Sequence, residues 1–197
     1  AKANGGVMYD ESTHRLRERP GRVVFQPCAR VSDIPERARF GVLAGFTIAG
    51  LSHPHPHAST DTLALMLSML THEAGLDPAQ MSFTTTTLRQ HDIDFLHHRG
   101  FSNITVRSVA EAKKSGTGSG WFRHPVSGWQ TATTSVEYRR GAHTVELGEI
   151  MDRDAGFGVE RLQWAMGGTM PTWRRRLSCV RWRTSWPLTV MRPPCTS

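Results

Sequence analysis

The chain has 197 residues, of which 38% are hydrophobic and 21% are charged, and its formal net charge is +7. This length and apolar content suffice for one domain with a hydrophobic core, and without a run of eighteen apolar residues no transmembrane helix or membrane partner is expected. The basic excess is local: Trp173–Ser197 holds six Arg and no acid, while the preceding 172 residues hold 18 basic and 17 acidic side chains. A basic nucleic-acid-binding surface on the domain itself is therefore disfavoured.

Two strands are predicted near the start of the chain. The run Arg22–Gln26 is rich in β-branched and aromatic residues, and Pro27 marks an edge or a bulge at its end. The second run alternates, and its apolar residues on one face are Phe40, Val42, Phe46 and Ile48. We therefore predict that Arg22–Val31 pairs with Phe40–Ala49 as an antiparallel hairpin.

The middle of the chain mixes predicted helices and strands. Ser59 to Ala74 is predicted to be helical, because an apolar stripe recurs at helical spacing and Gly75 follows as a C′ residue. The members of that stripe are Leu63, Met66, Leu67, Leu70 and Ala74. Four further elements are predicted: a strand over Met81–Leu88, a helix over Gln90–Arg99, a strand over Phe101–Val109 and a flexible loop over Gly116–Trp121.

Histidines cluster at two places. In His53–His57 three histidines alternate with prolines, and proline holds such a segment extended, where alternate side chains do not share one face. We interpret this segment as an exposed loop, with a metal site as the alternative. His97 and His98 are adjacent on a predicted helix and are interpreted as surface residues.

The segment Asp154–Leu162 is the most informative part of the sequence. It follows a predicted strand, Thr144–Met151, and leads into a predicted helix, Val159–Met166. Its two glycines let the backbone turn tightly and approach a ligand closely. An Arg in the first turn of a helix, together with the helix N-terminus, favours a polyphosphate ligand.

Two motifs resemble the class II aminoacyl-tRNA synthetases, and most closely the archaeal type of alanyl-tRNA synthetase. Gly156-x-Gly-x-Glu-Arg161, with Asp154 before it, resembles motif 3. Gln26-Pro-Cys-x-Arg-x-x-Asp-Ile34 resembles motif 2 without a gap. The collinear resemblance runs from about Val23 to Thr172, and motif 1 is not visible. It implies an α+β fold with a mainly antiparallel sheet flanked by helices, and an incomplete catalytic domain over residues 1–172.

The resemblance also implies the chemistry of adenylate formation, in which an amino-acid carboxylate attacks the α-phosphorus of ATP and pyrophosphate leaves. It implies that Arg30 contacts the α-phosphate and the carboxylate, that Arg161 contacts the γ-phosphate, and that Asp154 binds the amino group of alanine. Gly156 and Gly158 would leave room for the nucleotide, and either Phe40 or Phe46 would stack on adenine. ATP and Mg²⁺ are the implied cofactors, and tRNA is an implied acceptor.

Each of these residues has a simpler structural interpretation. Arg30 could be a surface residue on a strand, and Glu160 and Arg161 could form an ion pair at the start of a helix. Asp154 could cap that helix, and Phe40 and Phe46 could belong to the hydrophobic core.

Two other functions compete with an alanine–tRNA ligase. Gly41 and Gln130 replace glutamates of the family, and the loop at Gly116–Trp121 lacks the family's Asn and Pro. These departures favour a synthetase-like paralogue with a changed or lost substrate or acceptor. The basic segment alone favours a nucleic-acid-binding module, which the near-neutral domain argues against.

The resemblance stops at Thr172. Residues 173–197 combine Arg, Trp and Pro without an amphipathic period, so we predict a disordered tail produced by a shifted reading frame or a truncated gene. A real tRNA-binding tail is the alternative. Three cysteines without metal-type spacing and the absence of a signal-peptide pattern predict a cytoplasmic protein.

Overall fold

The computed structural model describes residues 7–10, 15–18, 22–30, 35, 39–52, 59–115, 118–124 and 127–170. Several sequence predictions fall outside these residues: the histidine-proline segment His53–His57, most of the segment between the two predicted hairpin strands, and the tail from Trp173.

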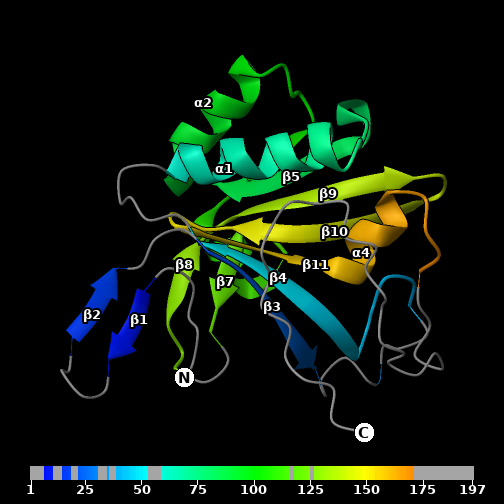
Figure 1. The fold of residues 1–197 in the computed structure, drawn as a ribbon. Helices are drawn as coiled ribbons and strands as arrows, with labels where there is room; N and C mark the ends of the chain where they lie inside the picture. The colour runs from blue at the N-terminus through cyan, green and yellow to red at the C-terminus, as the bar shows by residue number, and fades with distance from the viewer. Residues whose placement is uncertain are drawn as a thin grey trace, which may run out of the picture.

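A mostly antiparallel sheet of seven strands forms the centre of the molecule (Figure 1). Its strands, in spatial order, are β3 (Arg22–Ala29), β4 (Gly45–Ser52), β11 (Asp154–Gly158), β10 (His143–Ile150), β9 (Thr134–Arg140), β5 (Met81–Thr86) and β6 (Ile104–Arg107). Only β5 and β6 pair in parallel. Two small sheets accompany it: β1 (Val7–Asp10) with β2 (Arg15–Glu18), and β7 (Trp121–Arg123) with β8 (Gln130–Ala132). The predicted α+β fold with a mainly antiparallel sheet is confirmed.

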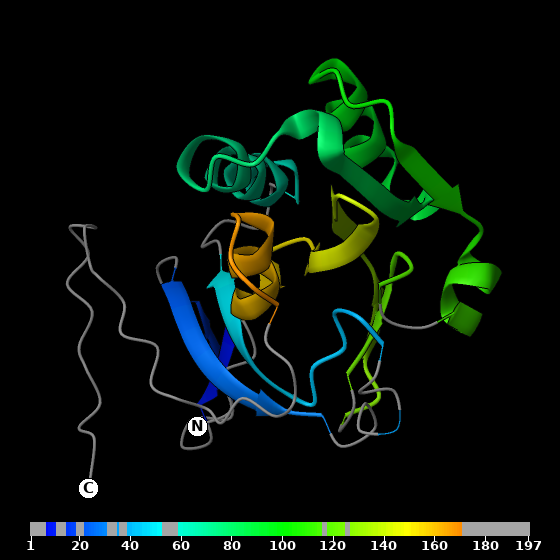
Figure 2. The same cartoon turned by 90° about the vertical axis from the view of Figure 1, so that its right-hand side faces the viewer.

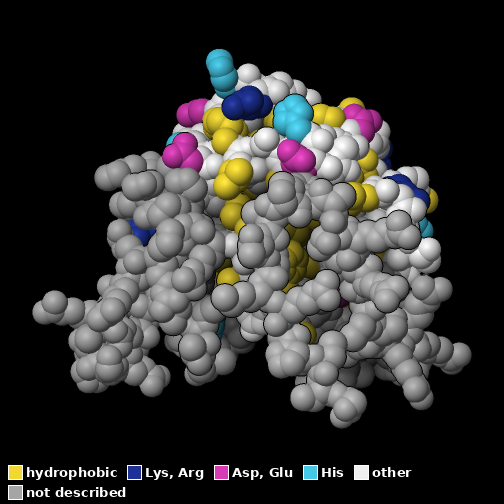
Figure 3. Space-filling model, viewed as in Figure 1, with side chains coloured by type: hydrophobic (Ala, Val, Ile, Leu, Met, Phe, Trp, Pro, Cys, Tyr) yellow, Lys and Arg dark blue, Asp and Glu magenta, His cyan; other side chains and the backbone are white. Residues whose placement is uncertain are grey.

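The helices are short and lie mainly to one side of the sheet. They are α1 (Ser59–Ser68), η2 (Met69–Glu73), η3 (Pro78–Gln80), η4 (Thr87–Arg89), α2 (Gln90–His98), α3 (Val109–Ser115) and α4 (Val159–Ala165). Figures 1 and 2 show α1 and α2 on one side of the sheet and the β7–β8 hairpin on the other. The outer surface of the α1–α2 layer carries charged and histidine side chains (Figure 3).

The predicted hairpin near the start is confirmed as an antiparallel pair, but its second strand begins later than predicted. β4 starts at Gly45 and runs to Ser52, and it pairs with the whole of β3. The segment before it turns instead, because Gly41 has a φ of +80° and the Val42 N–H donates to the Arg39 carbonyl oxygen. The apolar alternation from Phe40 therefore marks a strand only from Gly45 onward.

The predicted helix over Ser59–Ala74 is confirmed, with its last turns wound as the π-helix η2. Gly75 takes a φ of +65°, as a C′ residue requires. The predicted stripe is buried at its first four members, Leu63, Met66, Leu67 and Leu70. The stripe packs with the inner face of the sheet and with α4, so we call this the helix side of the sheet.

Three other predicted elements form with shorter boundaries: the strand over Met81–Leu88, the helix over Gln90–Arg99 and the strand over Phe101–Val109. The predicted flexible loop lies partly outside the described residues, and its last residue, Trp121, begins β7. The tight turn expected at Gly156 and Gly158 is wrong, because both lie in the extended strand β11. β5 ends at Thr86, because Thr87–Arg89 forms the short helix η4, and the last predicted strand of this region is reduced to Ile104–Arg107. Gly100 ends α2 with a φ of +86°. The two adjacent histidines of α2 are exposed, as predicted.

Arg140, at the end of β9, fixes the C-terminus of α4. Its guanidinium donates to the carbonyl oxygens of Trp164, Gly167 and Gly168 and lies over the Trp164 ring, 5.8 Å from the centroid. These carbonyls lie in and just after the last turn of α4, and the Trp164 oxygen also accepts the Gly167 N–H. The cation adds donors to them where the helix dipole is negative.

Arg140→Met is therefore expected to lower the free energy of unfolding by roughly 1–3 kcal/mol. Urea unfolding followed by circular dichroism measures the change. Arg139→Met is the matched control, because Arg139 is exposed and its side chain bonds among the described residues only to Gln80, and it should change stability by less than about 0.5 kcal/mol. Equal losses in the two variants would contradict the capping role.

Candidate functional site

A row of glycines lies on the side of the sheet opposite α1, which we call the open side. Gly50 of β4 is paired with Gly156 of β11, and Gly158 is paired with Ile48. A Cβ atom at Gly156 would meet only Ile48 Cγ2, at 3.6 Å, and one at Gly50 would meet only the Val24 carbonyl oxygen, at 3.8 Å, among the described residues. Among the described residues, no side chain covers the backbone of β4 and β11 at these two glycines, which are half-buried.

Arg30 and Phe46 lie at one end of this glycine row. Strand alternation puts Phe46 on the same side as Ile48 and Gly50. The guanidinium carbon of Arg30 lies 5.1 Å from the centroid of the Phe46 ring, within the range of a cation–π contact. Arg30 is thus held over an aromatic ring on the open side, although its backbone is on the exposed edge of the hairpin.

Arg161 reaches the open side from the first turn of α4. Its Cδ lies 3.4 Å from the position that a Cβ of Gly158 would take. The arginine side chain therefore runs through space that a side chain at position 158 would occupy. Its Nε donates to the Gly41 carbonyl oxygen, at 3.1 Å, and its Nη1 donates to the Glu146 carboxylate, at 3.2 Å. Nη2 makes no hydrogen bond with the described residues, so this nitrogen can donate to a ligand.

The alternative of a Glu160–Arg161 ion pair is wrong. Both carboxylate oxygens of Glu160 accept the Thr47 N–H, at 2.9 and 3.0 Å. β11 ends at Gly158, opposite Ile48, so the Thr47 N–H has no partner in that strand. The Glu160 carboxylate accepts this N–H instead of a strand carbonyl oxygen.

Asp154 begins β11 and shares the open side with Gly156 and Gly158. Its Oδ1 is buried and has no hydrogen-bond partner among the described residues. Burial raises the pKa of this carboxyl to about 6, and the charge of Arg153 opposes the shift. The alternative that Asp154 caps α4 is wrong, because Gly158 occupies the N-cap position.

The two candidate phenylalanines have different surroundings. Phe40 stacks on His143, with ring centroids 3.8 Å apart, and meets the edge of Trp164, at 5.5 Å. It lies in the turn before β4, outside the strands that carry the glycine row, and is 41% exposed. Phe46 lies on a strand that carries the row and also packs against the hydrophobic core, so of the two it is the one beside the row.

Two glutamates that sequence reasoning missed lie on the open side of β10. A bulge between Glu146 and Gly148 brings Glu146 and Glu149 to one face, which their spacing of three residues would otherwise prevent. Glu149 is opposite Gly156 in the neighbouring strand and is 8% exposed. The Gly between the two glutamates was the only sequence signal for this bulge.

Glu149 is held through one oxygen. Its Oε1 accepts the Gly118 N–H at 2.9 Å and the hydroxyls of Thr133 and Ser135 at 3.2 and 3.3 Å. Its pKa is raised to about 7, because burial and then the negative charge of Glu146 outweigh these three hydrogen bonds. Close to neutral pH this carboxyl is divided between its acid and its carboxylate forms.

A second missed cluster is centred on Arg89, at the end of η4. Arg89 is 2% exposed, and its Nε donates to Asp92 at 2.6 Å, while its Nη1 donates to Asp152 at 2.8 Å. The Thr134 hydroxyl also donates to Asp92, at 2.7 Å. The cluster thus ties α2 and β9 to the β10–β11 turn that precedes Asp154, and buried arginine was not predictable from the polar local sequence.

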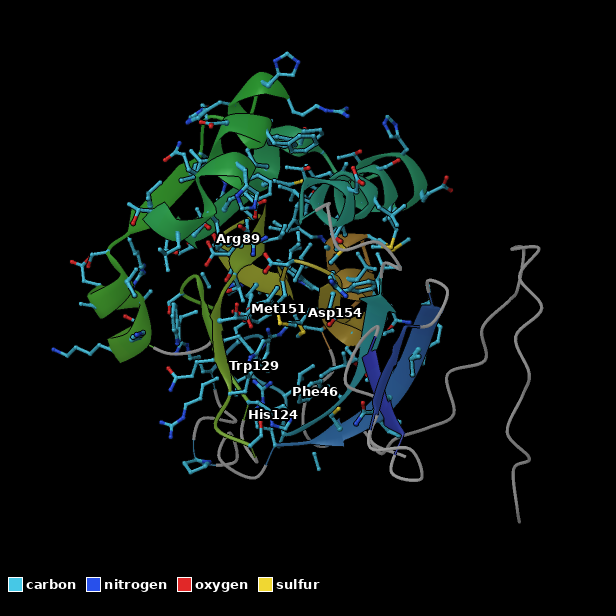
Figure 4. The ribbon with its side chains drawn as sticks, turned by 90° about the vertical axis from the view of Figure 1, so that its left-hand side faces the viewer. Phe46, Arg89, His124, Trp129, Met151 and Asp154 are labelled. Atoms are coloured by element: carbon cyan, nitrogen blue, oxygen red, sulfur yellow. The ribbon has the colours of Figure 1, made fainter. Side chains whose placement is uncertain are left out.

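Figure 4 shows how these groups lie. Met151 and Asp154 are adjacent across the β10–β11 turn, where the Met151 N–H donates to the Asp154 carbonyl oxygen at 2.7 Å. Arg89 is on one side of them in this view, and Phe46, His124 and Trp129 are on the other. Trp129 is 54% exposed and packs edge-on against Phe122, with centroids 6.0 Å apart.

Comparison with known proteins adds no relative: no model of a known protein family matches the chain, and no curated protein matches it significantly. No helix in the described part of the chain is long and apolar enough to cross a membrane. Among the same residues, no three His, Cys, Asp or Glu side chains are grouped so that they could hold a metal ion.

Proposed function

We propose that this domain binds ATP on the open side of its sheet and activates a small amino acid as its adenylate, in the manner of the class II aminoacyl-tRNA synthetases. The observation that supports the proposal is that three groups share one face of the sheet. Arg30 directly follows β3, Asp154 begins β11 and Arg161 lies in α4, and strand alternation and contacts put each on the face that carries Gly156. Two guanidinium groups and one carboxylate around a bare backbone surface suit a nucleotide and an amino acid.

Each group has a role in this proposal. Arg30 binds the α-phosphate and the substrate carboxylate, which brings the attacking oxygen in line with phosphorus. Arg161 uses its unoccupied Nη2 for the γ-phosphate, and its contact with Gly41 and Glu146 fixes its direction. The adenine ring stacks near Phe46. One bond forms from carboxylate oxygen to α-phosphorus, the bond from α-phosphorus to the bridging oxygen breaks, and pyrophosphate leaves with the electron pair.

Asp154 binds the substrate ammonium group. Its unpaired Oδ1 would gain a partner there, and as a carboxylate it would form a charge-assisted hydrogen bond. Gly156, two residues along β11 on the same face, and Gly50 opposite it leave room for a small side chain. Alanine is the substrate that the resemblance favours.

Magnesium fits the donor set of the same face. Mg²⁺ is usually held by one or two carboxylates together with substrate phosphates, and the Glu146 carboxylate lies beside Arg161, which is proposed to bind the terminal phosphate. When bound, the ion would neutralise charge on the phosphates and on the leaving pyrophosphate.

ATP–pyrophosphate exchange with a panel of amino acids tests the proposal. Alanine-dependent exchange supports an alanine–tRNA ligase-like activity. Exchange with another amino acid supports the second candidate, a paralogue with a changed substrate, which the glycine at position 41 and the glutamine at position 130 favour. A tRNA acceptor and a cytoplasmic location stay predictions.

Arg161→Ala is expected to weaken ATP binding about ten- to a hundredfold, because a charge-assisted hydrogen bond to phosphate contributes roughly 1.5–3 kcal/mol. Calorimetric titration with ATP measures the change, and circular dichroism checks that the domain stays folded. Arg139→Ala, an exposed arginine of β9, is the control and should leave the affinity unchanged. Unchanged affinity in folded Arg161→Ala would remove this residue from the site.

A further inference from the structure

Glu149 has a hydrogen-bonding capacity that the protein leaves unused. All three of its donors converge on Oε1: the Gly118 N–H, the Thr133 hydroxyl and the Ser135 hydroxyl. Oε2 receives no hydrogen bond from the described residues, and it is not among the fully buried side-chain atoms that lack a partner. Although the residue is only 8% exposed, this oxygen is therefore open to a donor from solvent or from a bound ligand.

The position of Glu149 shows what could supply that donor. Glu149 is opposite Gly156 in the neighbouring strand, and no side chain of Gly156 separates it from the glycine row. Asp154 lies two residues from Gly156 on the same face, so the two carboxyls are diagonal neighbours across β10 and β11. Residues in this relation are about 7–8 Å apart, with their Cβ atoms somewhat closer.

A small hydroxylated amino acid can bridge two carboxyl groups in this relation. In a β-hydroxy amino acid the nitrogen and the hydroxyl oxygen are about 3 Å apart, so with a hydrogen bond of about 2.8 Å at each end the two acceptor oxygens can be up to about 9 Å apart. An ammonium group on Asp154 therefore places a β-hydroxyl within reach of Glu149. A methyl group in the same place would bring no donor and would keep water from Oε2.

We propose that Glu149 is a specificity-determining residue that accepts the side-chain hydroxyl of the amino-acid substrate, so that the site prefers a small β-hydroxy amino acid, such as serine, to alanine. This inference rests on the proposed function and refines its substrate. The preference is strong in principle, because a site built to hydrogen-bond a hydroxyl strongly disfavours the analogue that lacks it.

Stable adenylate analogues test the inference without requiring turnover. The probes are 5′-O-(N-seryl-sulfamoyl)adenosine and its alanyl counterpart, and the binding of each to the full chain is measured by calorimetric titration. ATP is titrated in a separate experiment. The seryl analogue is expected to bind at least about tenfold more tightly than the alanyl analogue. Glu149→Leu removes the acceptor and should abolish or reverse this preference, whereas Glu137→Gln, a change of another open-side glutamate, should preserve it.

The outcomes separate the two proposals. Equal binding of the two analogues, or tighter binding of the alanyl one, overturns the role of Glu149 and leaves the proposed function in place. If neither analogue binds and ATP does not bind, the proposed function fails and this inference fails with it. Because the unmodified protein already gives the seryl-to-alanyl ratio, the test does not depend on whether the Glu149→Leu variant folds.

Discussion

Replacing Glu149 with Gln is expected to raise the free energy of unfolding near pH 8 by about 3 kcal/mol, and to change it little near pH 4. The pKa of this carboxyl is about 7 in the folded protein and has an ordinary value of 4.5. Below the ordinary value it is protonated in both states. As pH rises, the unfolded chain ionises first, so the contribution of Glu149 to stability falls until the folded pKa is passed. Gln has no such dependence.

Urea unfolding of both proteins between about pH 4 and pH 8 measures this difference. The difference between the two curves isolates Glu149, because every other titrating group is common to both proteins. Glu137→Gln is a control, since Glu137 is only partly buried and bonds to Ser82. Parallel curves for Glu149→Gln and the unmodified protein would show that the burial of this carboxyl has no energetic consequence.

Asp92→Ala is expected to destabilise the domain by about 3–5 kcal/mol, which for a domain of this size is a large part of the total. Arg89 and Asp92 are 2% and 0% exposed, and removal of the aspartate leaves the arginine buried without its closest counter-charge. The Thr134 hydroxyl loses its acceptor as well. Asp152 would remain as a partner of Arg89, but its side chain is 66% exposed and compensates only in part.

Equilibrium unfolding in urea gives the magnitude. Asp94→Ala is the matched control, because Asp94 is exposed on the same helix and bonds only to Gln90, and it should cost less than about 0.5 kcal/mol. The double variant Arg89→Met/Asp92→Leu should be more stable than Asp92→Ala, since it removes both buried charges together. A loss below about 1 kcal/mol in Asp92→Ala would contradict the account of this cluster.

Local patterns in the sequence were sufficient for most elements of the fold. The Ser59–Ala74 helix was predictable because its apolar stripe and the glycine that ends it, Gly75, are both local features of one continuous segment. The β3–β4 pairing was predictable because apolar alternation indicated two strands, Pro27 indicated that the first is an edge strand, and the two are close in sequence. The segment before Gly45 was not, because Phe40 and Val42 alternate like a strand while Gly41 takes a positive φ.

The candidate site depended on non-local pairing, which alternation cannot supply. Nothing in the residues alone places β11 beside β4, more than one hundred positions earlier, so the common face of Arg30, Asp154 and Arg161 was expected only through a family resemblance. Glu149 was missed because a regular strand would put it on the opposite face from Glu146. The bulge that reverses this is marked in the sequence by a single glycine.

The claim that the open side of the sheet binds ATP can be tested directly by amide chemical shifts. Titration of the ¹⁵N-labelled protein with ATP and Mg²⁺ should perturb the amides of β4 and β11 around the glycine row, above all Gly50, Gly156 and Gly158. The chemical shifts of the amides of α1 and α2, on the opposite side of the sheet, should change little. Shifts confined to the helix side, or no shifts at saturating ATP, would contradict the proposed function.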